Sequence, residues 1–230
     1  MKYPDLREEK KLWKLRYKSV AGLDEAGRGP LAGPVVAAAV VMKKILRKID
    51  ILREVKDSKK LSPKKREKLY KILKNCPFIG WGIGRVSEKV IDKINILEAT
   101  KLAMVKAVKK LKRRPDFLIL DGNFTLPSVA LARAGISPNT PQKSIVKADD
   151  KVFSCAAASI LAKVYRDKIM RKYHKKYPRY GFDKHKGYPT KYHLKMLKKY
   201  GSSRIHRKSF GPVAKVQKRN TCKILRNMIS

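Results

Sequence analysis

The sequence predicts an α/β fold with a mixed central β-sheet flanked by helices. Apolar runs of strand length end at acidic residues or glycines, and they alternate with longer segments of helical spacing. Three strands followed by a helix–strand–strand–helix order indicate a mixed sheet rather than a purely parallel one. No internal repeat interrupts the 230 residues, of which 43% are hydrophobic, so the chain can bury a sizeable core.

The N-terminal part is predicted to contain one helix and two strands. Residues 6–17 are rich in charge and are typical of a solvated helix that is only loosely attached. Residues 19–24 and 34–42 are apolar and are separated by a turn rich in glycine and proline. That arrangement is typical of neighbouring strands.

A helix, a strand and a second helix are expected next. Ser62 suits an N-cap and Pro63 suits the first helical position, which predicts a helix from this point. Residues 78–86 alternate glycine with larger side chains, as a strand packed closely against another element does. Residues 100–111 keep helical spacing, and this helix is expected to end before Pro115.

Two more strands and a long helix complete the predicted core. Residues 116–121 form a buried strand that ends at an aspartate, and residues 142–150 are predicted as a strand that ends in acids. The Ala-rich start of a helix over residues 153–173 is expected to lie close against the sheet. Short basic helices follow, one over Thr190–Tyr200 and one after Pro212.

These elements predict three parts of the chain. A charged N-terminal extension covers residues 1–18, and the main α/β domain covers residues 19–177. A basic helical C-terminal extension covers residues 178–230. The sequence has no clear linker at the second boundary.

The charge of the chain is extreme, because 58 Lys and Arg oppose 18 Asp and Glu and give a net charge of +40. Such a field attracts polyanions, and nucleic acid is the expected partner. Lysine enrichment in a hot or salty habitat is the alternative, but it normally brings matching glutamate. Residues 163–230 carry half of the excess, with Asp167 and Asp183 as their only acids, so we expect them to contact the nucleic-acid backbone.

Other classes of protein are disfavoured. Cys76, Cys155 and Cys222 are odd in number and lack Cys-x-x-Cys spacing, which argues against a disulfide framework or a zinc site. The N-terminal residues are too charged for a signal peptide. The longest apolar run, residues 35–42, is too short to span a bilayer. We expect a soluble cytoplasmic protein with no membrane contact.

Acids at strand ends are the candidates for chemistry in this basic chain. Neighbouring strand ends of an α/β sheet converge on one edge, where ligands bind. Carboxylates gathered there repel one another unless cations neutralise them, and oxygen ligands select Mg²⁺ or Mn²⁺. Two such ions about 3.5–4 Å apart support phosphodiester cleavage. The acids that follow apolar runs are Asp24, Glu25, Asp121 and Asp149, with Asp150 beside the last.

The alternative is that each acid merely closes a turn. Adjacent residues on a strand point to opposite faces, so Asp24 and Glu25 share one site only if the strand ends or twists there. The glycines that follow permit such a twist.

Two loops are candidates for contact with nucleic acid. Gly27-Arg28-Gly29 matches neither a P-loop nor a dinucleotide fingerprint, but its glycines allow close approach to a sugar–phosphate, and Arg28 suits a phosphate clamp. An ordinary turn is the alternative. Residues 180–190 interleave aromatic and basic side chains, which suits contact with sugars and bases. Here the alternative is a loop anchored to the core by its aromatics.

Several blocks of the sequence, in their order, resemble the ribonuclease HII family over about residues 20–213. They are AGLDEAGRGPLAGPVVAAAVV, DSKKLS, LDGN, VKADD followed by AAASILAKVYRD, YGFDKHKGYPT and HRKSFGP. The last two blocks look more like the bacterial branch. The resemblance implies a ribonuclease H-like fold with a helical C-terminal extension.

The resemblance also implies an activity. The family cuts RNA in RNA–DNA hybrids, including 5′ of single ribonucleotides in duplex DNA, and leaves 5′-phosphate and 3′-hydroxyl ends. Its partners are such hybrids and ribonucleotide-containing duplexes, in ribonucleotide excision repair and DNA replication. Two divalent cations, Mg²⁺ or Mn²⁺, are expected with substrate, and we expect a monomer.

Roles follow by matching motifs. The catalytic, metal-binding carboxylates would be Asp24, Glu25, Asp121 and Asp149, with Asp150 as a competitor for the fourth position. The substrate-binding residues would be Gly27, Arg28 and Gly29, which read the ribonucleotide, Lys59, which holds a phosphate, and Tyr188, which packs on the sugar and senses the 2′-hydroxyl.

The chain departs from the family pattern in two places. The stretch 123–144 looks longer than the usual link, so a loop insertion is expected, and Ala148 stands where many relatives have glycine. Two other functions remain open. One is a basic nucleic-acid-binding protein without catalysis, and the other is a different two-metal enzyme on this fold, such as a resolvase or a type 1 ribonuclease H.

Overall fold

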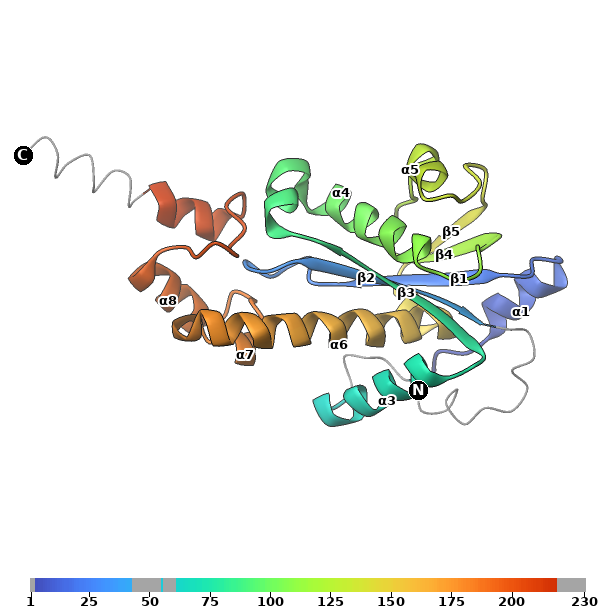
Figure 1. The fold of residues 1–230 in the computed structure, drawn as a ribbon, viewed down its shortest axis with the longest axis horizontal. Helices are drawn as coiled ribbons and strands as arrows, with labels where there is room; N and C mark the ends of the chain where they lie inside the picture. Colours follow the sequence, from blue (N-terminus) through green and yellow to red (C-terminus); the bar gives the residue numbers. More distant parts are fainter. Residues whose placement is uncertain (1–2, 43–54, 56–60, 219–230) are drawn as a thin grey trace, which may run out of the picture. The chain divides into compact units, whose positions relative to one another are not determined.

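The computed structural model describes residues 3–42, 55 and 61–218, and Lys59 lies outside the described residues. It contains a five-stranded sheet in the order β3-β2-β1-β4-β5 (Figure 1). β1 pairs antiparallel with β2 and parallel with β4, and β4 pairs parallel with β5, which confirms the predicted mixed sheet. The strands are β1 (Val20–Ala26), β2 (Val35–Met42), β3 (Ile79–Val86), β4 (Phe117–Asp121) and β5 (Gln142–Ile145).

Backbone contacts divide the chain into two compact units. The first unit comprises Met1–Ala26, Val36–Arg85 and Thr100–Tyr165. The second unit comprises Gly27–Val35, Val86–Ala99 and Arg166–Ser230. Nearly all of the sheet belongs to the first unit, and the most basic part of the chain belongs to the second. The boundaries of a main domain over 19–177 and an extension over 178–230 stay a prediction.

The first unit contains α1 (Arg7–Lys14), α3 (Pro63–Asn75) and α5 (Ser128–Arg133), together with parts of α4 (Glu88–Lys109) and α6 (Phe153–Lys176). The α5 helix lies within the long link between β4 and β5. The predicted start of α3 is confirmed, because the Ser62 hydroxyl accepts a hydrogen bond of 3.3 Å from the Lys65 amide.

The α4 helix begins well before the predicted start at residue 100. Its two halves are separated by Asn95, whose φ of 64° is not helical. The Asn95 side chain accepts hydrogen bonds from the amides of Leu97 and Glu98 and so caps the second half. The helix is therefore interrupted at Asn95, and the predicted segment from residue 100 lies in its second half.

Two close approaches fix the helices on the sheet. A Cβ at Gly22 of β1 would lie 2.5 Å from the Cys155 amide nitrogen, so α6 packs directly on this strand and the predicted contact of its Ala-rich start is confirmed. On β3, side chains at Gly82 and Gly84 would collide with the backbone of α4. Figure 1 shows the first-unit parts of α4 and α6 on opposite faces of the sheet.

The expectation that residues 6–17 form a loosely attached, solvated helix is wrong. In α1 the side chains of Glu9, Leu12 and Trp13 are buried. One Glu9 carboxylate oxygen accepts hydrogen bonds from the Ser154 amide (2.9 Å) and the Ser154 hydroxyl (2.8 Å). The charged sequence hid this role, because a buried glutamate looks like a surface residue until its partner at the start of α6 is known.

The buried position of Glu9 predicts a pH effect on stability. Burial raises the pKa of Glu9 from 4.5 to about 7. The stability that this raised pKa gives is fully present below pH 4.5 and is lost as the pH rises through about 7, at no more than about 1.4 kcal/mol per pH unit. We expect the melting temperature to fall between about pH 5 and 7, and the fall to be smaller in Glu9→Gln, which cannot ionise.

Glu8→Gln provides the matched control for this measurement. Hydrogen bonds from Lys143 and Lys11 lower the pKa of Glu8, so Glu8 stays ionised throughout this pH range. The control should therefore keep the full pH-dependent fall. Identical pH profiles for the unchanged chain and Glu9→Gln would show that Glu9 does not titrate as its burial indicates.

The second unit has its own small core and short helices, α7 (Phe182–His185) and α8 (Lys191–Tyr200). The Thr190 hydroxyl accepts from the His193 amide and Gly201 follows the last turn, which confirms the predicted α8. Residues 211–218 are helical as well. None of the helices in the described part of the chain is long and apolar enough to cross a membrane. The core comprises Ala32, Met170, Tyr180, Phe182 and Ile205.

Candidate active site

Three carboxylates from different elements of the first unit lie together. Asp24 lies on β1, Asp121 is the last residue of β4, and Asp149 lies on a short 3-10 turn. One oxygen of each lies within 4.8 Å of the others. The strands β1 and β4 are parallel, and the residues before Asp24 and Asp121 are paired, so both side chains reach the same end of the sheet. The three predicted acids therefore lie together, although only Asp121 is the last residue of a strand.

The turn that carries Asp149 differs from the prediction. The strand β5 ends at Ile145 instead of continuing into the acids, because Lys147 adopts a left-handed conformation (φ 56°) and a 3-10 turn follows. The Ala148 amide donates a hydrogen bond of 2.9 Å to the Asp121 carboxylate. This bond ties the turn to the end of β4 and brings the buried Asp149 into the cluster.

The structure separates the two acids that compete for the fourth position. Asp149 belongs to the three-carboxylate cluster and Asp150 does not. Asp150 instead lines a different cavity of the first unit, together with Asp5 and Lys143. The geometry therefore favours Asp149 over Asp150 as a partner of Asp24 and Asp121.

Glu25 lies beside the cluster without joining the three closest carboxylates. Its side chain is half-buried, and its backbone amide donates a hydrogen bond of 2.7 Å to the Asp24 carboxylate. Neighbouring strand residues point to opposite faces, which accounts for the different burial of the two acids. The role of Glu25 as a ligand stays a prediction.

The electrostatics of the cluster suit a bound cation. Burial raises the pKa of Asp24 well above its usual value, and the charges of Glu25 and Asp121 raise it further, against a hydrogen bond from Ser159. These carboxylates therefore repel one another, and a cation would relieve the repulsion. All the donors are carboxylate oxygens, which fit a hard divalent ion such as Mg²⁺ or Mn²⁺.

The loop Gly27-Arg28-Gly29 belongs to the second unit, where the buried side chain of Arg207 holds it. The Arg207 guanidinium donates hydrogen bonds to the carbonyls of Gly27 (2.6 Å), Arg28 (2.9 Å) and Gly33 (2.9 Å). Burial lowers its pKa to about 9, so it stays charged at neutral pH. The hydrogen bonds from this buried guanidinium therefore hold the loop in its conformation.

A second buried arginine joins residues 32–34, which follow this loop, to the segment around Tyr188. The Arg166 guanidinium donates to the carbonyls of Pro34 (2.9 Å), Ala32 (3.1 Å) and Lys186 (2.9 Å). A Cβ at Gly29 would lie 3.7 Å from the Tyr188 ring, so two of the predicted substrate-binding residues are neighbours. Tyr188 itself is 43% exposed, and its role in substrate binding stays a prediction.

Three histidines pack behind Tyr188. The His193 ring lies 2.9 Å from the Tyr188 carbonyl through Nδ1 and 3.0 Å from His206 through Nε2, and it stacks on His185. Burial lowers the pKa of His193 to about 4 and that of His206 to about 3. These rings are therefore neutral at physiological pH and support the position of Tyr188.

The sequence reasoning missed Arg166 and Arg207 as organising residues. Both lie within blocks that carry the family resemblance, AKVYRD and HRKSF, but a chain with 58 Lys and Arg gives no local sign of which cation is buried. Of the predicted residues, Lys59 lies outside the described residues.

Known proteins resemble this chain in sequence and in fold. The ribonuclease HII family matches residues 21–213. A ribonuclease HII from Chlamydia trachomatis is 50% identical over 206 residues, which cover 90% of this chain and 88% of the relative. The crystal structure of a ribonuclease H2 from Pyrococcus horikoshii matches with a TM-score of 0.69 and 33% identity, over 87% of this chain and 98% of that one. The ribonuclease HII of Archaeoglobus fulgidus, solved in a complex with PCNA, matches with a TM-score of 0.65 and 28% identity, over 84% of this chain and 95% of that one.

Proposed function

The chain belongs to the ribonuclease HII family, and we propose that it cuts duplex DNA on the 5′ side of a single embedded ribonucleotide. As a type 2 ribonuclease H it is a metal-dependent endoribonuclease that acts on RNA–DNA hybrids. The observation that carries the proposal is the buried cluster of Asp24, Asp121 and Asp149, in a chain whose net charge of +40 suits a nucleic-acid substrate.

In this proposal the carboxylates hold and orient the divalent ions, with Glu25 as a fourth ligand. Two bound ions would supply a nucleophilic water and stabilise the leaving 3′-oxygen, so that a 5′-phosphate and a 3′-hydroxyl result. Mg²⁺ is the expected physiological ion and Mn²⁺ the substitute, because every donor is an oxygen. The chain needs no Ser, Cys or His nucleophile for this reaction.

We assign recognition of the ribonucleotide to Gly27, Arg28, Gly29 and Tyr188. The Arg207 side chain donates to the carbonyls of Gly27 and Arg28 and so fixes the backbone of this loop. The groups proposed to contact a sugar–phosphate are the backbone amides of the loop and the Arg28 guanidinium. A phosphate contact from Lys59, action as a monomer and a part in ribonucleotide excision repair belong to the same proposal.

A nicking assay tests the proposal. The full chain is incubated with a DNA duplex that contains one ribonucleotide, with Mg²⁺, with Mn²⁺ and with EDTA. We expect a metal-dependent nick on the 5′ side of the ribonucleotide and none in an all-DNA duplex. Binding without a nick would indicate the non-catalytic alternative, and cleavage restricted to long RNA runs would indicate a type 1 specificity.

Tyr188→Ala should separate recognition from binding. Because Tyr188 is exposed beside Gly29, its loss should reduce cleavage at a single ribonucleotide by about tenfold or more, on the scale of one stacking contact. Duplex affinity should change much less, because it depends mainly on phosphate contacts. Tyr188→Phe keeps the ring and is the matched control. Equal losses of cleavage and affinity in Tyr188→Ala would make Tyr188 a structural anchor instead.

A further inference from the structure

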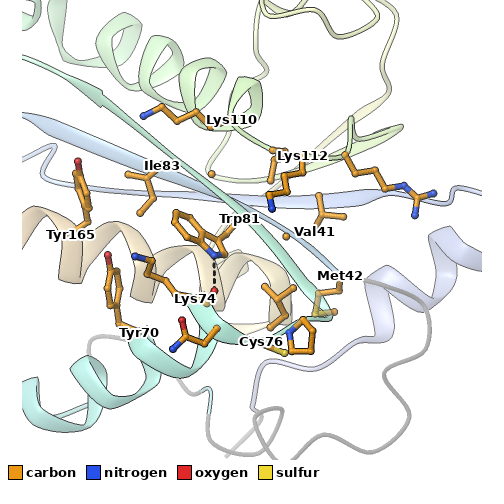
Figure 2. Close-up of a pocket in the computed structure, with 17 residues that line it drawn as sticks. Val41, Met42, Tyr70, Lys74, Cys76, Trp81, Ile83, Lys110, Lys112 and Tyr165 are labelled. Carbon is orange, nitrogen blue, oxygen red and sulfur yellow. Dashed lines mark hydrogen bonds between the residues drawn. The ribbon is translucent and has the colours of Figure 1, made fainter.

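A cavity of about 850 Å³ lies along β3, at the edge of the sheet in the first unit (Figure 2). Residues of α3 and α6 line it on one side of the strand, and the segment that follows α4 lines it on the other. Among the described residues that line it, none is Asp or Glu, whereas Lys74, Lys110, Lys112 and Arg113 all belong to it. The proposed cleavage reaction gives this cavity no role.

Trp81 is the central aromatic side chain of the cavity, and its position follows from β3. Glycine alternates with larger residues on this strand, and Gly82 and Gly84 face the backbone of α4. The half-buried Trp81 therefore lies on the opposite face, towards α3. Its indole N–H donates a hydrogen bond of 3.1 Å to the Lys74 carbonyl, which fixes the orientation of the ring.

One cation lies over this ring, and three more line the cavity on the other side of β3. The Lys74 ammonium lies 4.9 Å from the centroid of the Trp81 ring and 5.5 Å from that of Tyr70. Lys110, Lys112 and Arg113 are exposed where α4 ends. No carboxylate of the described part of the chain lines the cavity, so these side chains give it a positive field that favours phosphate groups.

A fixed aromatic ring beside several cations matches the chemistry of single-stranded nucleic acid. An unpaired base stacks on an aromatic side chain, and the neighbouring phosphates bind Lys and Arg. A fully paired duplex does not offer a free base face, so the ring selects a single strand. An acidic peptide added to the edge of β3 would use the same charges, but it gives no reason for an anchored indole.

We propose that the cavity beside β3 is a second nucleic-acid site, which binds a single-stranded segment through base stacking on Trp81 and phosphate contacts with Lys112 and Arg113. This site is separate from the three-carboxylate cluster and does not depend on the proposed cleavage. It would let the enzyme hold an unpaired flank or a displaced strand as well as the duplex that it cuts.

The two tryptophans of the chain allow a local test. Trp13 is buried, and its indole nitrogen has no hydrogen-bond partner among the described residues, so Trp13→Phe is a conservative change that leaves Trp81 as the only tryptophan. The full-length Trp13→Phe chain is titrated with a short oligothymidine in EDTA. We expect saturable quenching of Trp81 emission. An abasic oligomer of equal length and charge should give little quenching.

Charge variants in the same background test the phosphate contacts. Lys112→Gln/Arg113→Gln should raise the oligomer concentration at half-maximal quenching by about tenfold at low salt. It should also reduce the slope of log binding constant against log salt concentration by about 1.4. Lys10→Gln/Lys14→Gln removes the same charge from the exposed face of α1 and should shift the midpoint less than about twofold. Both double variants should still nick a blunt duplex with one ribonucleotide.

Three outcomes would overturn the proposal. One is the absence of quenching by oligothymidine. Another is equal quenching by the abasic oligomer, or by polyglutamate, which would indicate a peptide site. The third is an equal shift of the quenching midpoint in Lys10→Gln/Lys14→Gln, which would show that only the net charge of the chain matters. A chain that binds in this way but does not nick would contradict the proposed function alone, so the two failures are distinguishable.

Discussion

Asp121→Asn is expected to abolish metal-dependent cleavage while leaving binding of an RNA–DNA hybrid largely intact. The Asn side-chain oxygen can still accept the hydrogen bond from the Ala148 amide, so the turn that carries Asp149 is kept and only the charge is lost. Loss of several kcal/mol of charge stabilisation corresponds to a rate decrease of roughly 10³-fold or more. Nicking of a duplex with one ribonucleotide measures the rate, and binding in EDTA measures the affinity.

The same variant should be more stable than the unchanged chain when no metal is present. Asp24 is destabilised by burial and by the neighbouring charge of Asp121, and the substitution removes that repulsion. We therefore expect a melting temperature a few degrees higher in EDTA. Asp150→Asn is the matched control, because Asp150 lies outside the cluster, and it should cleave normally. Substantial Mg²⁺-dependent turnover by Asp121→Asn would contradict the assignment of the cluster.

Arg207→Ala is expected to cost both stability and cleavage, although the carboxylates are unchanged. The substitution removes three hydrogen bonds to the carbonyls of Gly27, Arg28 and Gly33. Leaving buried carbonyls without donors should lower the free energy of unfolding by about 3 kcal/mol or more. Thermal denaturation measures the first effect and the nicking assay the second.

Two further variants show whether the geometry of the Arg207 side chain matters. Arg207→Lys keeps the charge but lacks the planar fork, so it should recover only part of the stability. Arg204→Ala removes an exposed arginine three residues earlier and should behave like the unchanged chain. Normal stability and cleavage in Arg207→Ala would show that the loop holds its conformation without this cation.

The sequence predicted the parts of the fold that depend on local patterns. Apolar runs located β1, β2 and β4, and alternating glycines located β3. Ser62 and Thr190 marked helix starts because capping is a local interaction. The acids Asp24 and Asp121 were identified because they end apolar runs in a chain with few acids. Asp149 was identified as well, but its 3-10 turn was not, because that turn depends on a bond to Asp121 from a distant strand.

The features that were missed depend on contacts between distant residues. Glu9 and Ser154 are 145 positions apart, and Arg207 and Gly27 are 180 positions apart. A single sequence does not reveal such pairs, since a buried glutamate or arginine has the same local surroundings as an exposed one. The likeness to ribonuclease HII was informative because family motifs record these long-range requirements together.

The contact between α1 and the start of α6 means that the family boundary and the folding boundary do not coincide. A chain trimmed to the family-matched residues would lose the Glu9 carboxylate, which accepts a hydrogen bond from the Ser154 amide. It would also lose the buried side chains of Leu12 and Trp13. Backbone pairing between Asp5 and Val152 would be lost with them. Shortened versions of this enzyme would therefore lack stabilising contacts that begin three residues from Asp149. Loss of activity on trimming would not by itself identify a catalytic residue in the removed segment.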